Sequence, residues 1–121
     1  MEFALLLPVL MMILFGIIEF GMALYRQAIL TNASREGARL GIVQSVPAIT
    51  AAAVDTAINN YLGPAGITPG TVTRTIVGVG GVTGTPVTVT LTLPYTYAVL
   101  PGLTGIAPSI NLVASTVMRH E

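Results

Sequence analysis

Few side chains in this 121-residue chain have types and spacings that could support catalysis. His120 is the single histidine and there is no cysteine, so no second nitrogen or sulfur ligand accompanies it and we expect no metal site. Glu36 and Asp55 could act as an acid–base pair only if the fold brought them together, and a solvated or salt-bridged surface is the favoured interpretation. No serine lies in a nucleophile-elbow context. We therefore expect no catalytic residue, no cofactor and no enzyme activity.

Two short motifs suggest a ligand or a modification but fit ordinary structure better. Residues 78–84 are glycine-rich, yet Thr83 stands where the dinucleotide-binding fingerprint needs its third glycine, and no helix is predicted to follow. We interpret this segment as a hairpin loop. Residues 32–34 match an N-glycosylation sequon, but they lie inside a predicted helix, which disfavours modification. O-linked sugar on the threonine-rich strands stays open.

Charged residues at the ends of, and within, the N-terminal apolar segment are the more informative candidates. Residues 3–18 contain no charged side chain, whereas Glu2 precedes them and Glu19 follows. A carboxylate at membrane depth is costly and usually marks a functional pairing. Glu19 and Arg26 share a helix face but are too far apart for direct contact along a straight helix. Two alternatives stay open: Glu19 has a partner on a neighbouring helix, or it lies near lipid headgroups and needs only water.

The apolar segment itself predicts a membrane-length helix. Continued to Tyr25, it is about 34 Å long as a helix, enough to cross a hydrocarbon core of about 30 Å. Pro8 is expected to kink or locally melt it, because proline lacks an N–H group and crowds the preceding turn. Arg26 is the first basic residue, which would place that end in the cytoplasm if nothing preceded Met1. A basic leader removed before Met1 resolves this conflict, and a cleavable signal peptide is disfavoured.

Helical character is expected to continue through residues 27–44 and to end at residues 45–47. Small residues recur every fourth position, which lets another backbone approach closely, and we assign them to packing between the helix and the rest of the chain. Larger apolar residues at helical spacing are expected to face the same core. The small residues are Ala33, Gly37 and Gly41, and the apolar positions are Ile29, Ala33, Leu40 and Val43.

The remaining sequence predicts a short helix followed by strands. The helix is expected over residues 48–62, with one apolar side made of Ile49, Val54, Ala57, Ile58 and Tyr61. Threonine then alternates with valine or leucine, the pattern of a sheet with one buried face. Strands are expected at residues 71–77, 86–93 and 109–118, forming an antiparallel meander, and residues 94–108 are expected to be irregular. The predicted fold class is α+β, with a long N-terminal hydrophobic helix and a small antiparallel head.

Composition limits the partners of such a chain. Only 8% of the residues are charged, against about 25% in soluble domains, and the formal net charge is zero. There is no basic patch to bind nucleic acid, and little charge repulsion would keep copies of the chain apart. We expect two parts: a helix over residues 1–45, and a head over residues 46–121 that is too small to be strongly stabilised by its own core.

Several segments together resemble the TadE-like pilin family: residues 2–8, 15–21, 33–39 and 112–119. The resemblance implies a pilin-like fold and a type IV pilin-related subunit whose basic leader a prepilin peptidase removes after a glycine. A glutamate near the new N-terminus then assists docking, and Glu2 matches it. The chain departs from the family at its start, because the small residues and the glycine that usually precede this glutamate are absent.

The resemblance further implies a homo-oligomeric helical filament outside the cell, with a pool in the cytoplasmic membrane before assembly. The expected partners are copies of the chain and the inner-membrane pilus assembly machinery. We expect Glu2, Pro8, Glu19 and Arg26 to act in assembly. Two alternatives stay open: a minor pilin or membrane-anchored assembly component, and a surface adhesin that binds through an aromatic pocket formed by Tyr61, Tyr95 and Tyr97.

Overall fold

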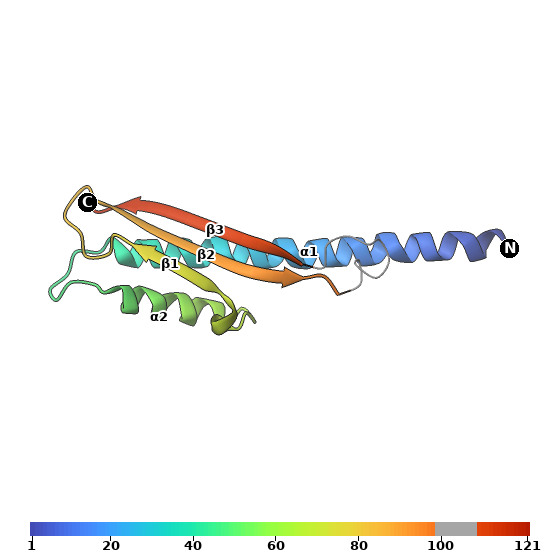
Figure 1. Ribbon diagram of the computed structural model, residues 1–121, viewed down its shortest axis with the longest axis horizontal. Helices are drawn as coiled ribbons and strands as arrows, with labels where there is room; N and C mark the ends of the chain where they lie inside the picture. The colour runs from blue at the N-terminus through green and yellow to red at the C-terminus, as the bar shows by residue number, and fades with distance from the viewer. Residues whose placement is uncertain (99–108) are drawn as a thin grey trace.

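A computed structural model describes residues 1–98 and 109–121 of the chain. One helix runs along the molecule, and a shorter helix and three strands gather around its C-terminal half (Figure 1). This confirms the predicted α+β, pilin-like arrangement. In chain order the elements are α1 (Glu2–Gly41), α2 (Ala51–Leu62), a short 3-10 turn (Pro69–Thr71), β1 (Thr73–Val77), β2 (Pro86–Thr96) and β3 (Ser109–Arg119).

Helix α1 is continuous over 40 residues, about 60 Å, and Pro8 lies inside it. The helix is therefore not melted at Pro8, because one proline removes a single backbone hydrogen bond while leucine, methionine and alanine around it favour helix. It ends at Gly41, where the Ile42 N–H group donates to the Ala38 carbonyl at 3.1 Å. The expectation that Val43 faces the core was wrong: the helix ends before it, and its side chain is exposed.

Helix α2 begins at Ala51, three residues later than expected. Thr50 is its N-cap, and the Thr50 hydroxyl accepts a hydrogen bond from the Ala53 N–H group at 3.2 Å. Val54 and Ile58 are buried as predicted, but Tyr61 is exposed and Leu62 is buried instead. Buried residues therefore recur every fourth position in α2, on the side of the helix that contacts α1 and the sheet.

The three strands form one antiparallel sheet in the order β1-β2-β3, which confirms the predicted meander. Thr75, Thr90 and Ser115 lie side by side across it. The loop between β1 and β2 begins at Gly78, where a positive φ of 87° and the nearby Pro86 carbonyl leave no room for a side chain.

The strand boundaries differ from the prediction at two places. Thr71 belongs to the 3-10 turn, so β1 begins at Thr73. Strand β2 continues to Thr96, so residues 94–96 are not irregular as expected. Pro94 lies beyond the last β1 pairing, at Thr92, and proline is tolerated where a strand has a neighbour on one side only. Residues 97–98 belong to no helix or strand, as expected, and residues 99–108 lie outside the described residues.

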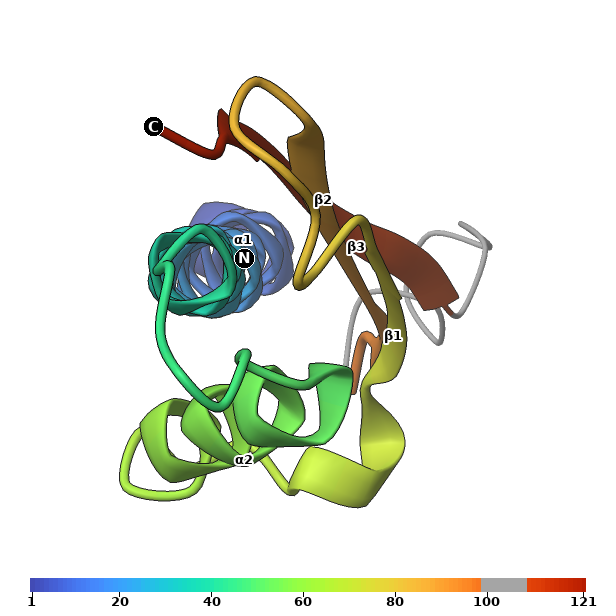
Figure 2. The same ribbon diagram turned by 90° about the vertical axis from the view of Figure 1, so that its left-hand side faces the viewer.

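The core lies between one face of the sheet and the two helices. Figure 2, a view along α1, shows α1 and α2 on the same side of the sheet. Alternate residues of β2 point into this space, as the threonine–valine alternation predicted. The buried set includes Val87, Val89, Leu91 and Leu93 from β2, Leu30, Ala33 and Ala38 from α1, and Val54, Ile58 and Leu62 from α2.

Candidate functional site

The N-terminal half of α1 exposes its apolar side chains. Glu19 is the first buried residue of the helix, and large residues before it are open to the surroundings, among them Phe3, Leu6 and Ile17. In Figure 1 this half extends past the ends of the three strands. Of the helices that the structure describes, α1 is the one long and apolar enough, by length and composition, to cross a membrane. An apolar surface of this size marks an interaction with lipid or with another protein.

Two of the predicted assembly residues lie within this exposed half. Glu2 occupies the first turn of α1, where a negative charge complements the positive end of the helix dipole. Pro8 lies in the second turn, and both side chains are exposed. Neither is placed near the head by the fold, so any role of these two residues involves molecules other than the head of the same chain.

Glu19 lies where α1 meets the head, and its side chain is 7% exposed. Its Oε1 atom accepts a hydrogen bond from the Ala98 N–H group, and the Tyr95 hydroxyl donates to the Glu19 backbone carbonyl at 3.5 Å. Neither sequence-based alternative included this arrangement, in which the partner of Glu19 belongs to its own chain. A charge-assisted bond from a backbone N–H group offsets part of the cost of burying a carboxylate.

Arg26 lies two turns after Glu19 and is linked to the same place through Tyr95. The guanidinium carbon is 5.5 Å from the centroid of the Tyr95 ring, a cation–π geometry. The Tyr97 ring meets the Tyr95 ring edge to face, with centroids 5.4 Å apart. We call Glu19, Arg26, Tyr95, Tyr97 and Ala98 the junction cluster. The sequence indicated that Glu19 and Arg26 share a face, but it did not indicate the aromatic residues that connect them.

The small-residue stripe of α1 lies against the head. Ala33, Gly37 and Gly41 are all buried. A Cβ atom at Gly37 would lie 2.9 Å from Cδ1 of Ile58, and one at Gly41 would lie 2.9 Å from Cγ1 of Val87. The side chains of α2 and β2 thus occupy the space that larger residues in α1 would need.

Sequence reasoning missed the role of Ser34 beside this stripe. Its hydroxyl lies 2.7 Å from the Thr116 hydroxyl of β3 and also donates to the Thr31 carbonyl. Ser34 is fully buried. The third residue of the sequon at residues 32–34 is therefore a packing residue within a helix, whereas glycosylation acceptors lie in surface loops. The signal that could have found it is a polar residue next to the apolar stripe.

The two carboxylates considered for acid–base chemistry have separate partners. Glu36 accepts from Arg39 at 3.0 Å on the surface of α1, and this hydrogen bond lowers the pKa of the Glu36 carboxyl below its usual value. Asp55 forms an ion pair with Arg74 of β1, with 2.6 Å between Oδ1 and Nη1. The fold does not bring Glu36 and Asp55 together, and the salt-bridged interpretation is confirmed for both.

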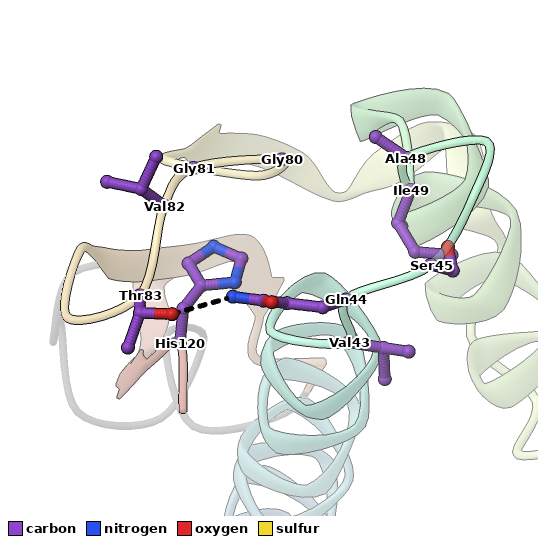
Figure 3. Close-up of a pocket in the computed structure, with 10 residues that line it drawn as sticks. All are labelled: Val43, Gln44, Ser45, Ala48, Ile49, Gly80, Gly81, Val82, Thr83 and His120. Carbon is purple, nitrogen blue, oxygen red and sulfur yellow. Dashed lines mark hydrogen bonds between the residues drawn. The ribbon is translucent and has the colours of Figure 1, made fainter.

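A pocket of about 320 Å³ lies at the opposite end of the molecule from the N-terminus, and Figure 3 shows its lining. His120 forms part of its wall but is only 3% exposed. Its ring nitrogens Nδ1 and Nε2 each lie 3.1 Å from a backbone carbonyl, those of Ile42 and Gly78. The ring therefore joins the end of α1 to the β1–β2 loop. The pocket is lined by Val43, Gln44, Ser45, Ala48, Ile49, Gly80, Gly81, Val82, Thr83 and His120.

The candidate residues for a metal site and for an aromatic pocket lie on different parts of the described fold. No group of three histidine, cysteine or carboxylate residues that could hold a metal occurs in the part of the chain that the structure describes. Tyr95 and Tyr97 pack together in the junction cluster, whereas Tyr61 lies on α2. Two of the three tyrosines considered for a binding pocket thus form a pair, and Tyr95 of this pair contacts α1.

Comparison with known proteins identifies the N-terminal segment. The family model of TadE-like proteins matches residues 1–39, which is almost the whole of α1. No curated protein and no solved structure matches the chain. The resemblance seen in residues 2–8, 15–21 and 33–39 is confirmed, whereas residues 112–119 lie outside the match. The assignment therefore rests on the helix and not on the sheet.

Proposed function

We propose that this chain, whose residues 1–39 are those of a TadE-like protein, is a structural subunit that polymerises through α1 into an extracellular Tad-type filament. The observation that carries the proposal is the division of α1. Its N-terminal half exposes apolar side chains, and one face of its C-terminal half is buried against the head. Residues 1–45 are then the assembly element and residues 46–121 the head.

The physical reason for polymerisation is the exposed apolar surface. Burying a leucine, isoleucine or phenylalanine side chain contributes about 1.5–3 kcal/mol, and α1 exposes many of these before Glu19. Before assembly the lipid of a membrane covers these apolar side chains, and after assembly the α1 helices of neighbouring copies cover them. Head-to-tail contacts that do not close into a ring produce a helical filament. The near absence of net charge lets the heads approach one another.

The remaining assembly residues have roles within this proposal. Glu2, at the exposed end of α1, is placed to pair with the N-terminal amine of a neighbouring copy, since an unpaired buried charge costs several kcal/mol. Pro8 limits backbone hydrogen bonding in the segment that changes surroundings from lipid to protein. Ala33, Gly37 and Gly41 hold the head close to the helix. A prepilin peptidase and inner-membrane assembly machinery are the partners that such a subunit requires.

The first experiment is electron microscopy of fibres sheared from cells, with mass spectrometry of their main band. We expect thin fibres composed chiefly of this chain. A matched pair of variants tests whether fibre formation depends on α1. Leu6→Arg, in the exposed half of the helix, should abolish fibres. Val82→Arg, at an exposed position on the head, should not affect fibre formation. An arginine in a helix bundle would be buried without a partner.

Three results would redirect the proposal. Fibres that lack this chain, with the intact chain in the membrane fraction, would indicate a minor pilin or an assembly component. Fibres of the Leu6→Arg variant that match the wild type would contradict polymerisation through α1. Turnover of any substrate that is abolished by changing Asp55 or His120 would indicate an enzyme instead.

A further inference from the structure

The junction cluster lies beside the part of α1 at which the apolar surface ends on the head-facing side of the helix but continues on the opposite side. On the side that faces the head, the apolar stretch stops at Glu19, the first buried residue. On the other side it continues through Phe20, Met22 and Leu24, all exposed, to Tyr25. The head-facing stretch, residues 3–18, is about 24 Å long, and the opposite stretch is about 34 Å long.

These lengths bracket the thickness of a membrane. A hydrocarbon core is about 30 Å thick, so the head-facing stretch is a few Å too short to span it. A short hydrophobic segment draws its flanking residues to the interface or tilts the helix. When α1 spans a membrane, the residues drawn to the interface are therefore those of the junction cluster.

The chemistry of the cluster suits that position. Tyrosine is enriched at membrane–water interfaces, because its ring is apolar and its hydroxyl reaches water. Tyr95 packs against Tyr97 and lies beside Arg26, the residue that follows Tyr25 on α1. The Arg26 guanidinium can bind phosphate oxygens in a bidentate manner. Glu19 is the one acidic group in the cluster, and it is turned toward the head, where Ala98 donates to it.

We propose that the junction cluster, together with Tyr25, is a docking surface for the phospholipid headgroup layer. The head rests on this layer while α1 spans the membrane, before the subunit enters a filament. The proposal rests on the part of the proposed function in which α1 spans a membrane before assembly. It adds the position of the head relative to that membrane and the residues that hold the head there.

The chain contains no tryptophan, so a single introduced tryptophan reports one position without background. We would reconstitute the full chain in vesicles of phosphatidylcholine and phosphatidylglycerol carrying lipids brominated at a shallow acyl position, which quench indole fluorescence on contact. The reporters are Tyr97→Trp in the cluster and Tyr25→Trp beside it on α1. Phe15→Trp controls for insertion of the helix, and Tyr61→Trp on α2 controls for the rest of the head.

We expect blue-shifted emission and strong quenching for Phe15→Trp, Tyr97→Trp and Tyr25→Trp, with water-like, unquenched emission for Tyr61→Trp. Replacing Arg26 by glutamine should reduce the quenching of the Tyr97→Trp reporter severalfold in phosphatidylglycerol vesicles. The same change at Arg35, exposed farther along α1, should leave that quenching unchanged. The Tyr25→Trp reporter keeps the test valid if a change at Tyr97 disturbs the head.

The outcomes separate this proposal from the proposed function. Quenching of Phe15→Trp without quenching of Tyr97→Trp and Tyr25→Trp would overturn the docking surface and leave the filament subunit intact. Equal quenching of Tyr61→Trp would mean that the head lies on its side, which also overturns it. Blue-shifted but unquenched emission of Tyr97→Trp that becomes water-like when the protein is diluted in lipid would assign the surface to a second copy and overturn the docking surface. If Phe15→Trp is unquenched, the membrane step of both proposals fails.

Discussion

His120 shows how a residue that could do chemistry acquires a structural role. Both ring nitrogens face backbone carbonyls, of Ile42 and Gly78, and its backbone N–H and C=O groups pair with Thr85 and Gly84. One residue thus connects β3 to the end of α1 and to the β1–β2 loop. His120 therefore couples the far end of the head to the C-terminal end of α1.

We expect His120→Ala to lower the free energy of unfolding by about 1–3 kcal/mol, the effect of leaving buried polar groups without a partner. His120→Gln should recover part of this loss, because its amide can still donate to one carbonyl. Denaturant unfolding of the detergent-solubilised chain measures both. Glu121→Ala, at the exposed next residue, is the control and should be neutral. Equal stability of His120→Ala and the control would contradict the connection.

At the scale of elements, α1 is one helix with two surroundings. Two of its glycines make the contrast clear: a Cβ atom at Gly21 would meet nothing within 4 Å, whereas one at Gly37 would lie 2.9 Å from Ile58. Glycine disfavours helix by about 1 kcal/mol relative to alanine. At Gly37 the lower helix propensity of glycine is offset by close packing with α2. At Gly21 no contact within this chain requires a glycine.

The same substitution at both glycines tests this contrast. Gly37→Leu should destabilise the fold by about 1–3 kcal/mol, because extra atoms in a filled core force side chains out of their rotamers. Gly21→Leu should be neutral or slightly stabilising in detergent. Thermal unfolding followed by circular dichroism gives the comparison. If Ile58→Ala is added, Gly37→Leu should become less harmful; independent effects of the two changes would argue against direct packing.

At the scale of the whole molecule, the head does not contain its whole core. Leu30, Ala33 and Ala38 of α1 are completely buried among residues of α2 and β2. Burying a leucine alone contributes about 1.5–3 kcal/mol, and a domain has a total stability of about 5–15 kcal/mol. The C-terminal half of α1 and the head therefore share one core and are expected to fold together.

A pair of fragments tests this interdependence. A fragment of residues 22–121 keeps the buried half of α1 and should unfold cooperatively with dispersed amide signals in NMR spectra. A fragment of residues 46–121 loses it and should show neither property. Cooperative unfolding of the shorter fragment at the same midpoint would mean that the head is stable without α1.

The sequence by itself determined the elements and their order. The apolar N-terminal segment, the helical spacing of apolar residues in residues 48–62 and the alternation of threonine with valine in residues 86–93 each predict one element, because each pattern belongs to a single local geometry. The sequence also determined the family of residues 1–39. The sequence did not determine where each helix and strand begins and ends, because these boundaries depend on neighbouring elements. Helix α2 begins only after its N-cap, Thr50, and Pro94 can lie in β2 because β1 no longer pairs with β2 at that point.

Only the tertiary structure decided which side chains meet. Glu19 meets Ala98, Arg26 meets Tyr95, and His120 meets Ile42 and Gly78, all across long sequence separations. No periodicity carries this information, because it depends on how the sheet is placed along α1. That placement follows from packing the buried faces of β2 and α2 against the small residues of the helix, and it brings the end of β2 to the point on α1 where the apolar surface ends.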